Sequence, residues 1–335
     1  MEIKDRIYGS INVTEPVLAE LIDSPAIQRL KGIQQFGMPQ RFYPYPGFSR
    51  YEHSVGVMLV LKKLGANVEE QAAGLIHDVS HTAFSHLVDW VMGDRSKEDH
   101  QDKNLQRVVS LSTIPKILQK YDLDSEKITD VKQYSLLEKP APHLCADRID
   151  YSLREFYTWA APTIVSQCID DLVNHNGQIA FKTGDSAEKF AYAYAKCQKE
   201  HWGGAECTVR WELLTRALKI GLEKGFVKPD DFYGVDEDLI GKLQGSGNPE
   251  ISQVLSILEN TSLNLNENRT NPQFNLRKKF RYIDPHYSSN GSLHILSETD
   301  QNYKNFLEEQ RKINERGSEA PNRSRAAGLL KVTQL

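Results

Sequence analysis

Cysteine is scarce in this chain of 335 residues: there are four, scattered and without a CxxC pair. That scarcity argues against a disulfide framework and against a cysteine-rich zinc site. No apolar run approaches the ~18 residues that a membrane span needs, and the opening MEIKDRIYGSI lacks an apolar segment of signal-peptide length. We therefore expect no association with a membrane and a cytoplasmic location, with the nucleus as the alternative.

An excess of positive charge is also lacking. The formal net charge is −4 and the sequence pI is about 6.2, so the composition does not imply nucleic acid as a partner. Charged residues make up 26% and hydrophobic residues 39%, as in ordinary globular proteins. The length allows one large domain or two smaller ones. An anionic substrate would have to be bound by a local basic pocket.

Histidine, in contrast, is concentrated in one stretch. Residues 50–89 read RYEHSVGVMLVLKKLGANVEEQAAGLIHDVSHTAFSHLVD and hold four of the ten histidines of the chain. A neutral imidazole next to a carboxylate supplies the nitrogen and oxygen donors that suit Fe, Mn, Zn or Co. A single histidine on an apolar face is more often a hydrogen-bonded core residue, but four at this spacing favour a metal site.

The helical period predicts how these donors meet. The pattern of small and apolar residues over 72–91 predicts one buried helix, with His77 and His81 on the same face. Asp78 points about 100° away from His77 on such a helix, so an ion beside the helix needs further ligands from elsewhere. A second helix is expected over 53–64. We predict four metal ligands, with the last carboxylate far downstream: His53, His77, Asp78 and Asp147.

This ordered set resembles the H…HD…D signature of the HD-domain metal-dependent phosphohydrolases. The longer string RYEHSVG…GLIHDVSHTAFSHLVD is similar to the deoxynucleoside triphosphate triphosphohydrolase branch, in which a sterile-alpha-motif domain can precede the HD domain. The resemblance covers residues 1 to about 157. It implies an all-α fold with an HD-domain helical core at 1–160. A helical extension with a small β-hairpin would complete the pocket at 161–296, and a helix with a polar tail would follow at 297–335.

The resemblance also implies the cofactor and the acid–base residues. One divalent transition metal is expected (Fe, Mn, Zn, Co or Ni), with Mg as a further candidate on the substrate phosphates. His81 would protonate the leaving oxygen, and Asp89, eight residues along the predicted helix, would hold that imidazole in its protonated form. His86 and His100 match residues that line the phosphate channel and assist catalysis in the family.

Two arginines are expected to bind phosphate. Arg50 lies three residues before His53, and a cation so near a divalent metal is favoured when an anion lies between them. The alternative is an ion pair with Glu52 or another acid. Arg148, where the family often carries Lys, would reach a second phosphate oxygen.

The substrate sugar is expected to contact residues from two segments. Asp147, Tyr151 and Glu155 are four and eight residues apart, so they form one inward stripe of a helix. By the resemblance, Tyr151 and Glu155 face the sugar, as do Gln35 and Phe36. The alternatives are a core tyrosine, a solvated acid and ordinary packing. Glu155 stands where the branch prefers Asp, and its extra methylene could alter sugar selection.

The function implied is hydrolysis of a deoxynucleoside triphosphate to the deoxynucleoside and tripolyphosphate. A nucleoside monophosphate phosphatase and a phosphodiesterase use the same kind of site and stay open as alternatives. A nucleotide sensor without turnover is a further alternative, because Asp23, Gln28 and Lys31 resemble part of a regulatory nucleotide site in the branch. The family also implies a homo-oligomer.

The second half of the chain is less informative. The pattern predicts a helix followed by a hairpin over 164–182 and two long helices over 186–224, separated near Gly203 and Gly204. The basic segment 276–287, LRKKFRYIDPHY, is similar to one that runs near the nucleotide or at a subunit contact in the family.

Overall fold

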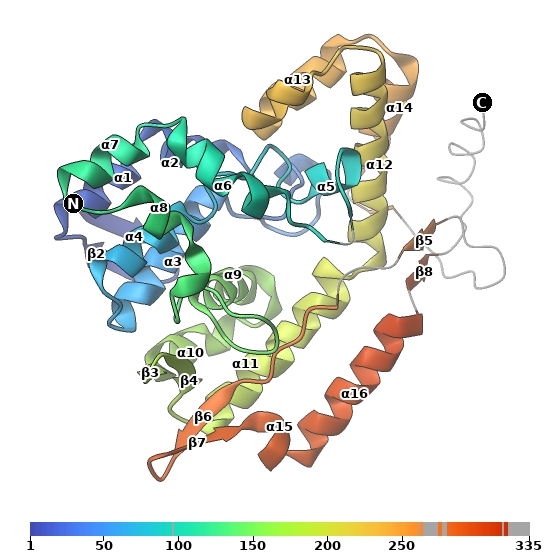
Figure 1. Ribbon diagram of the computed structural model, residues 1–335. Helices are drawn as coiled ribbons and strands as arrows, with labels where there is room; N and C mark the ends of the chain where they lie inside the picture. Colours follow the sequence, from blue (N-terminus) through green and yellow to red (C-terminus); the bar gives the residue numbers. More distant parts are fainter. Residues whose placement is uncertain (96, 261, 264–273, 277–279, 317, 321–335) are drawn as a thin grey trace.

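The structure is a computed structural model that describes residues 1–95, 97–260, 262–263, 274–276, 280–316 and 318–320 (Figure 1). Helices dominate it, and a small four-stranded sheet lies in the C-terminal half. The predicted all-α class, with a β-hairpin in the second half, is therefore confirmed. Residues 317 and 321–335 of the expected polar tail, and residues 277–279 of the basic segment, lie outside the described residues.

The chain begins with a short hairpin that is followed by two short helices. Strand β1 (Glu2–Asp5) pairs with β2 (Gly9–Asn12), and Gly9 has a φ of +76°, which glycine adopts without steric cost. Helix α1 (Pro16–Ile22) and helix α2 (Pro25–Arg29) each begin with a proline at the first helical position. Two 3₁₀ turns follow, Leu30–Gly32 and Gln40–Phe42, and they lead into the loop before α3.

Three helices form the centre of the first half: α3 (Arg50–Lys63), α4 (Val68–Ile76) and α9 (Ala146–Glu155). Helix α3 packs against both of the others. It begins three residues before the predicted start, because Ser49 and Glu52 form a capping box. Gly56 permits the close approach of α9, since a Cβ there would lie 1.9 Å from Asp150 Oδ1.

The prediction of one continuous helix over 72–91 is wrong. Helix α4 ends at Ile76, and the next helix, α5, covers Leu87–Val91. Phe84 and Ser85 between them have φ values of 61° and 51°, the left-handed region, which a right-handed helix cannot contain. The histidines at 77, 81 and 86 therefore lie on a compact turn and not on one helical face.

Short helices cover one side of this centre, as expected for residues 94–140 (Figure 1). They are α6 (His100–Ser110), α7 (Ile114–Lys120), α8 (Ser125–Thr129) and a 3₁₀ turn at Val131–Gln133.

The second half contains long helices and two π-helical turns, at Phe156–Ala160 and Gln198–Trp202. The second π turn joins the two long helices at the predicted break, so the prediction for 186–224 is confirmed. The helical elements of this half are a 3₁₀ turn at Pro162–Ile164, α10 (Val165–Asp171), α11 (Gly184–Cys197), α12 (Ala205–Glu223), a 3₁₀ turn at Pro229–Tyr233, α13 (Asp236–Gly245), α14 (Pro249–Leu258), α15 (Leu296–Thr299) and α16 (Gln301–Arg316).

The four-stranded sheet has the order β3-β4-β6-β7. Its first hairpin is the predicted one, β3 (Leu172–His175) with β4 (Gln178–Phe181), and its second is β6 (His286–Ser289) with β7 (Ser292–Ile295). Parallel pairing of β4 with β6 brings the late segment back to the middle of the chain. A separate pair joins β5 (Phe274–Leu276) to β8 (Ser318–Ala320).

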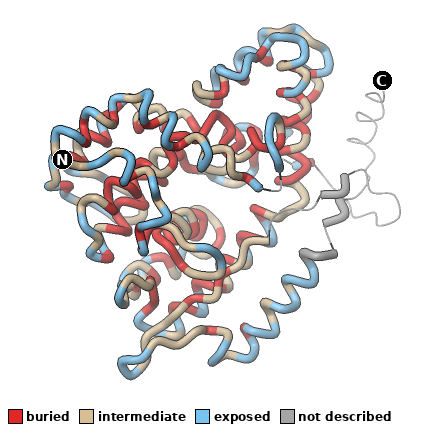
Figure 2. Tube along the Cα trace, viewed as in Figure 1, coloured by how far each residue is buried: buried red, intermediate tan, exposed pale blue. Residues whose placement is uncertain are grey.

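Buried residues gather in two clusters, visible as red segments in Figure 2. The first lies among α1, α3, α4, α9 and α11, and the second around α12, α13 and α14. Phe36 packs against both, so the boundary between the clusters passes the loop that precedes α3. Among the described residues, no helix combines the length and the apolar character that crossing a membrane requires.

Candidate metal centre and adjoining cleft

The four predicted metal ligands meet at the junction of α3, α4 and α9. His53 Nε2 lies 2.9 Å from Asp147 Oδ1 and 3.6 Å from Asp78 Oδ2, and His77 Nε2 lies 3.4 Å from Asp78 Oδ1. Donor atoms of His53, His77 and Asp147 all lie within 4.8 Å of one another. Segments almost a hundred residues apart thus supply nitrogen and oxygen donors to one point.

The buried carboxylates of the cluster favour positive charge on the neighbouring imidazoles. Burial lowers the pKa of His77, but Asp78 and Asp147 outweigh it and raise the value to about 9. Burial likewise opposes ionisation of Asp147, yet its hydrogen bond with His53 and the nearby His77 imidazole hold the carboxyl pKa well below its usual range. His77 Nε2 is buried without a hydrogen-bond partner among the described residues. This donor set fits a divalent ion of the transition series.

A second layer of buried side chains fixes the orientation of His53. Its Nδ1 lies 2.8 Å from Asp150 Oδ2, and the other Asp150 oxygen accepts a hydrogen bond from the Tyr8 hydroxyl. Arg154 Nε donates to Asp150, and its Nη2 donates to Asp5 in the N-terminal hairpin. Because Asp150 accepts from Nδ1–H, the Nε2 of His53 stays available to a metal.

Arg50 is held beside the cluster by contacts to all its nitrogens. Nη1 lies 2.6 Å from Asp78 Oδ2, Nε donates to Ser85 Oγ and Nη2 donates to the Gln35 carbonyl. The ion pair with an acid, which the sequence left as the alternative, is present, and Arg50 also lines the adjoining cleft.

His81 has a different carboxylate partner from the one predicted. Its Nε2 lies 3.2 Å from Asp78 Oδ1, whereas Asp89 Oδ1 accepts the backbone N–H of His100. The predicted alignment of Asp89 with His81 depended on a continuous helix, which the turn at Phe84 and Ser85 interrupts. Burial and the nearby Arg50 lower the pKa of His81 to about 4, so the imidazole is not held in the cationic form that was expected.

The other two candidate histidines, His86 and His100, follow the turn at Phe84 and Ser85 in the chain. His86 stands edge-on to His81, with ring centroids 4.9 Å apart, and lines the cleft. Burial and His81 hold its pKa well below its usual range. His100 begins α6, and its buried Nε2 lacks a hydrogen-bond partner among the described residues.

A cleft of about 590 Å³ adjoins the cluster. The predicted substrate residues Gln35, Phe36, Tyr151 and Glu155 all line it, together with Arg50 and His86. Its remaining lining residues are Glu98, Trp202, Trp211 and Arg281. Gln35 Oε1 is buried without a hydrogen-bond partner in the described structure, so it is available to a ligand hydroxyl or amine.

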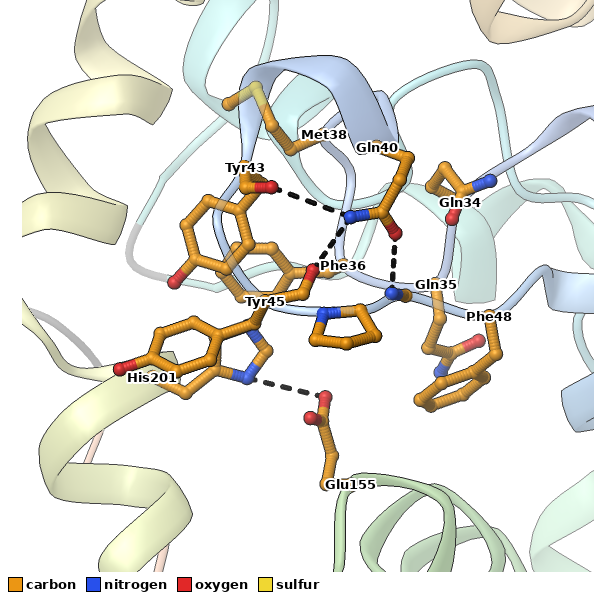
Figure 3. A pocket seen from close by; sticks show the side chains of 12 residues that line it. Gln34, Gln35, Phe36, Met38, Gln40, Tyr43, Tyr45, Phe48, Glu155 and His201 are labelled. Carbon is orange, nitrogen blue, oxygen red and sulfur yellow. Dashed lines mark hydrogen bonds and ion pairs between the residues drawn. The ribbon is translucent and has the colours of Figure 1, made fainter. Parts of the chain in front are cut away.

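A smaller pocket of about 290 Å³ shares Gln35, Phe36 and Glu155 with the cleft (Figure 3). His201 lies in it, stacked on Phe36 at 4.0 Å between ring centroids. Glu155 lies at the junction, with Oε1 3.2 Å from His201 Nδ1 and Oε2 accepting from Trp159 Nε1. The pocket is therefore an aromatic box next to the cleft, closed by one carboxylate.

The loop that carries Gln35 is tied to the histidine turn by Asp236. One carboxylate oxygen accepts the Gln34 N–H and the other accepts the Phe84 N–H, at 2.9 and 2.8 Å. Burial raises the pKa of Asp236 to about 7, and these two N–H groups oppose the shift.

Arg148 does not line the cleft. Its Nη1 donates to the carbonyls of His143 and Lys139, and Nη2 also donates to Lys139. The predicted phosphate contact was inferred from its place beside Asp147, but an adjacent helical residue points about 100° away. The three residues compared with a regulatory site lie around Tyr51: Lys31 lies over its ring, and burial raises its pKa, which Gln28 and Asp23 also affect. Gln28 also donates to the Ile22 carbonyl.

Sequence reasoning missed several residues of the site. Asp150 had a usable signal, because it follows Asp147 by three residues and so lies on the same helical side. Glu98, Trp211 and Arg281 carried no comparable local signal. They reach the cleft only through the packing of segments remote in sequence.

The fold and the site together define a helical, metal-binding hydrolase: buried imidazoles and carboxylates border a cleft that carries arginines. The protein-family model of the HD domain matches residues 50–133. The uncharacterized protein YdhJ of Bacillus subtilis is 39% identical over 85% of this chain and 88% of its own length. The metal-dependent phosphohydrolase cns2 of Cordyceps militaris is 30% identical, over 84% of each chain.

Relatives of lower identity are consistent with the same family and fold. The deoxynucleoside triphosphate triphosphohydrolase SAMHD1 homolog of Dictyostelium discoideum is 24% identical, over 77% of this chain and 57% of its own. The crystal structure of a hypothetical protein from Aquifex aeolicus has the same fold, with a TM-score of 0.65, 20% identity and coverage of 90% of this chain and 92% of that one. The chain belongs to the HD-domain metal-dependent phosphohydrolases and is a hydrolase.

Proposed function

We propose that this hydrolase cleaves phosphate esters of nucleotides. The observation that carries the proposal is that Arg50, which pairs with the proposed ligand Asp78, lines a cleft together with aromatic and polar side chains suited to a nucleoside. Tyr151 and Trp202 offer ring surface, and Gln35 offers an unpaired amide oxygen. His53, His77, Asp78 and Asp147 are the proposed ligands of one Fe, Mn, Zn, Co or Ni ion.

The residues have separate proposed roles. When bound, the ion would supply Lewis acidity and a stronger water nucleophile at neutral pH. Arg50 would bind a phosphoryl oxygen and balance charge developing on phosphorus. His81 and His86, beside the cluster, would exchange protons with the attacking water and the leaving oxygen. Residues 161–296 would complete the pocket, since Trp202, Trp211 and Arg281 all come from them.

The charge of the cleft favours a nucleoside monophosphate, with orthophosphate as the product. Among the described residues, Arg50 and Arg281 are the arginines that line it, and both are paired with carboxylates. Glu98 and Glu155 add negative charge to the same walls. The divalent ion balances the two negative charges of a monophosphate. A triphosphate carries about two more negative charges, which would need more cations.

The deoxynucleoside triphosphate triphosphohydrolase reaction is the second candidate. Its support is the similarity to the SAMHD1 homolog of Dictyostelium discoideum, which is named for that activity. A homo-oligomer stays a prediction of the family resemblance, to be tested by analytical ultracentrifugation with and without nucleotide.

The test is product identification with a panel of nucleotides. The protein, loaded in turn with Mn²⁺, Fe²⁺, Co²⁺, Ni²⁺, Zn²⁺ or Mg²⁺, is incubated with nucleoside monophosphates, dNTPs, NTPs and cyclic dinucleotides. Phosphorus-31 NMR then distinguishes orthophosphate from tripolyphosphate. Orthophosphate from a monophosphate supports the first candidate, and tripolyphosphate from a dNTP supports the second. Nucleotide binding without turnover under every metal would contradict both and favour the sensor.

A further inference from the structure

The segment before β6 brings a cation to the cleft from the far end of the chain. It runs alongside α11 in Figure 1, and Phe280 to Ile283 border the same crevice as Tyr194 of that helix and Gln198 of the π turn that follows it. Asp284 N donates to the Pro142 carbonyl, and the Ile283 carbonyl accepts from Tyr303. The backbone that follows Arg281 is therefore held by two hydrogen bonds, and the guanidinium itself is held by Glu98 in the cleft wall.

The guanidinium of Arg281 meets Glu98, with 2.5 Å between Nη2 and Oε2. Both side chains line the cleft next to His86. Glu98 has a φ of 51°, a left-handed conformation that is unfavourable for a residue with a side chain. Its side chain is only 7% exposed. A strained residue with a buried carboxylate thus lies in the wall of the cleft, beside the Arg281 guanidinium.

The two arginines of the cleft differ in what their carboxylates do. Arg50 is paired with Asp78, a proposed metal ligand, and its other nitrogens contact Ser85 and Gln35. Arg281 is paired with Glu98, which belongs to no group of candidate metal ligands among the described residues. A phosphate can therefore replace the Glu98 carboxylate as the partner of Arg281 without disturbing the metal centre.

We propose that Arg281 binds a substrate phosphate and that Glu98 restricts the number of phosphate groups that the cleft accepts. The inference rests on the proposed nucleotide hydrolase. A phosphate entering between Arg50 and Arg281 gains charge-assisted hydrogen bonds from Arg281. A chain of phosphates would also have to pass the Glu98 carboxylate, whose repulsion grows with each added negative charge.

The test compares the metal-loaded wild type with Arg281→Gln and Glu98→Gln. Loss of a charged hydrogen bond is expected to raise KM for the best nucleotide about 10- to 100-fold in R281Q, with a smaller change in kcat. E98Q is expected to raise kcat/KM for the triphosphate, relative to the monophosphate of the same nucleoside, about tenfold. R281K keeps the charge and should recover part of the KM.

Two readouts separate substrate binding from a purely structural role. Metal content and Tm are measured for every variant. R41Q serves as the matched control because Arg41 and Glu237 form an exposed ion pair, with side chains 40% and 60% exposed, and neither lines the cleft. If R281Q lowers Tm but leaves KM within twofold of the wild type, Arg281 only anchors its segment and the inference is overturned. An unchanged substrate ratio in E98Q overturns the role of Glu98.

Failure of the proposed function would be recognised separately. If the wild type hydrolyses no nucleotide, metal-loaded wild type and R281Q are titrated calorimetrically with inorganic phosphate and tripolyphosphate. Weaker binding to R281Q then still supports an anion-binding role, and equal binding overturns it.

Discussion

The metal centre and the cleft wall are built in different ways. Each ligand of the centre comes from the compact helical half, and each contacts at least one other ligand or a buried partner such as Asp150. The wall draws on the loop before α3, on α9, on the π turn before α12 and on the segment before β6. Under the proposed function, the centre would determine the class of reaction, whereas the wall, which combines early and late segments, would select the substrate.

Removing a ligand should have the largest effect. Asp78→Ala takes away one donor and leaves Arg50 without its carboxylate, so we expect loss of bound metal and a fall in hydrolysis of about a thousandfold or more. Metal content by inductively coupled plasma mass spectrometry, together with turnover, checks this. An Asp78→Ala protein that keeps both would show that the four residues are not one centre.

A buried acid that organises the wall should come next. The folded-state pKa of Asp236 is about 7, against about 3.9 in an unfolded chain. Between these values the folded state binds a proton that the unfolded state has released, so stability falls as pH rises through this window. Asp236→Asn removes the titration, and the free energy of unfolding of the wild type relative to the variant should decrease by about 2–4 kcal/mol between pH 4 and pH 8.

Urea denaturation at both pH values measures that difference. A wild type that gains stability relative to the variant at pH 8 would mean that the N–H groups of Gln34 and Phe84 outweigh burial. In that case the wall would be fixed by an ionised carboxylate.

The outer layer of the centre should have an intermediate effect. Asp150→Asn keeps the size of the side chain but weakens its bond to His53 Nδ1, so metal affinity should fall about 10- to 100-fold. Competition with a chromogenic chelator measures the affinity. Asp185→Asn, in an exposed pair with Lys189, is the control, and an equal loss in both variants would deny Asp150 a specific role.

A change in the wall should have the smallest effect. Glu155→Asp shortens the side chain that contacts Trp159 and His201, and we expect the ratio of kcat/KM for deoxy- over ribonucleotide to shift by about three- to tenfold. Metal content should stay unchanged. A loss of metal in this variant would show that wall and centre are not separable.

The proximity of the four proposed ligands could be anticipated because three of them lie in one dense stretch of sequence and the fourth completes the family signature. Four donor residues lie in fixed order on two helices and the turn after one of them, and the inward stripe from Asp147 to Glu155 follows from the helical period alone. The prediction of a continuous helix over 72–91 was wrong because Phe84 and Ser85 take left-handed conformations. Glycine usually marks such positions in a sequence, and there is none here. For the same reason Asp89 does not lie beside His81 as predicted.

The wall could not be predicted in the same way. Arg281 is almost two hundred residues from His86, and only the parallel pairing of β4 with β6 and the contact with Pro142 bring its segment back. Arg148 was misplaced for the opposite reason, since a neighbour in sequence of a ligand need not be its neighbour in space. Carbonyls at 139 and 143 bind its guanidinium instead.

The two π turns give the aromatic box a particular sensitivity to the length of the chain. Trp159 lies in the first turn, and His201 and Trp202 lie in the second. A π turn holds one residue more than the α-helical turn it replaces, and π turns are frequent at functional sites. Deleting a single residue from either turn would let it rewind as α-helix and change the direction of the side chains within the turn. The extra residue of each π turn therefore sets where Trp159, His201 and Trp202 point.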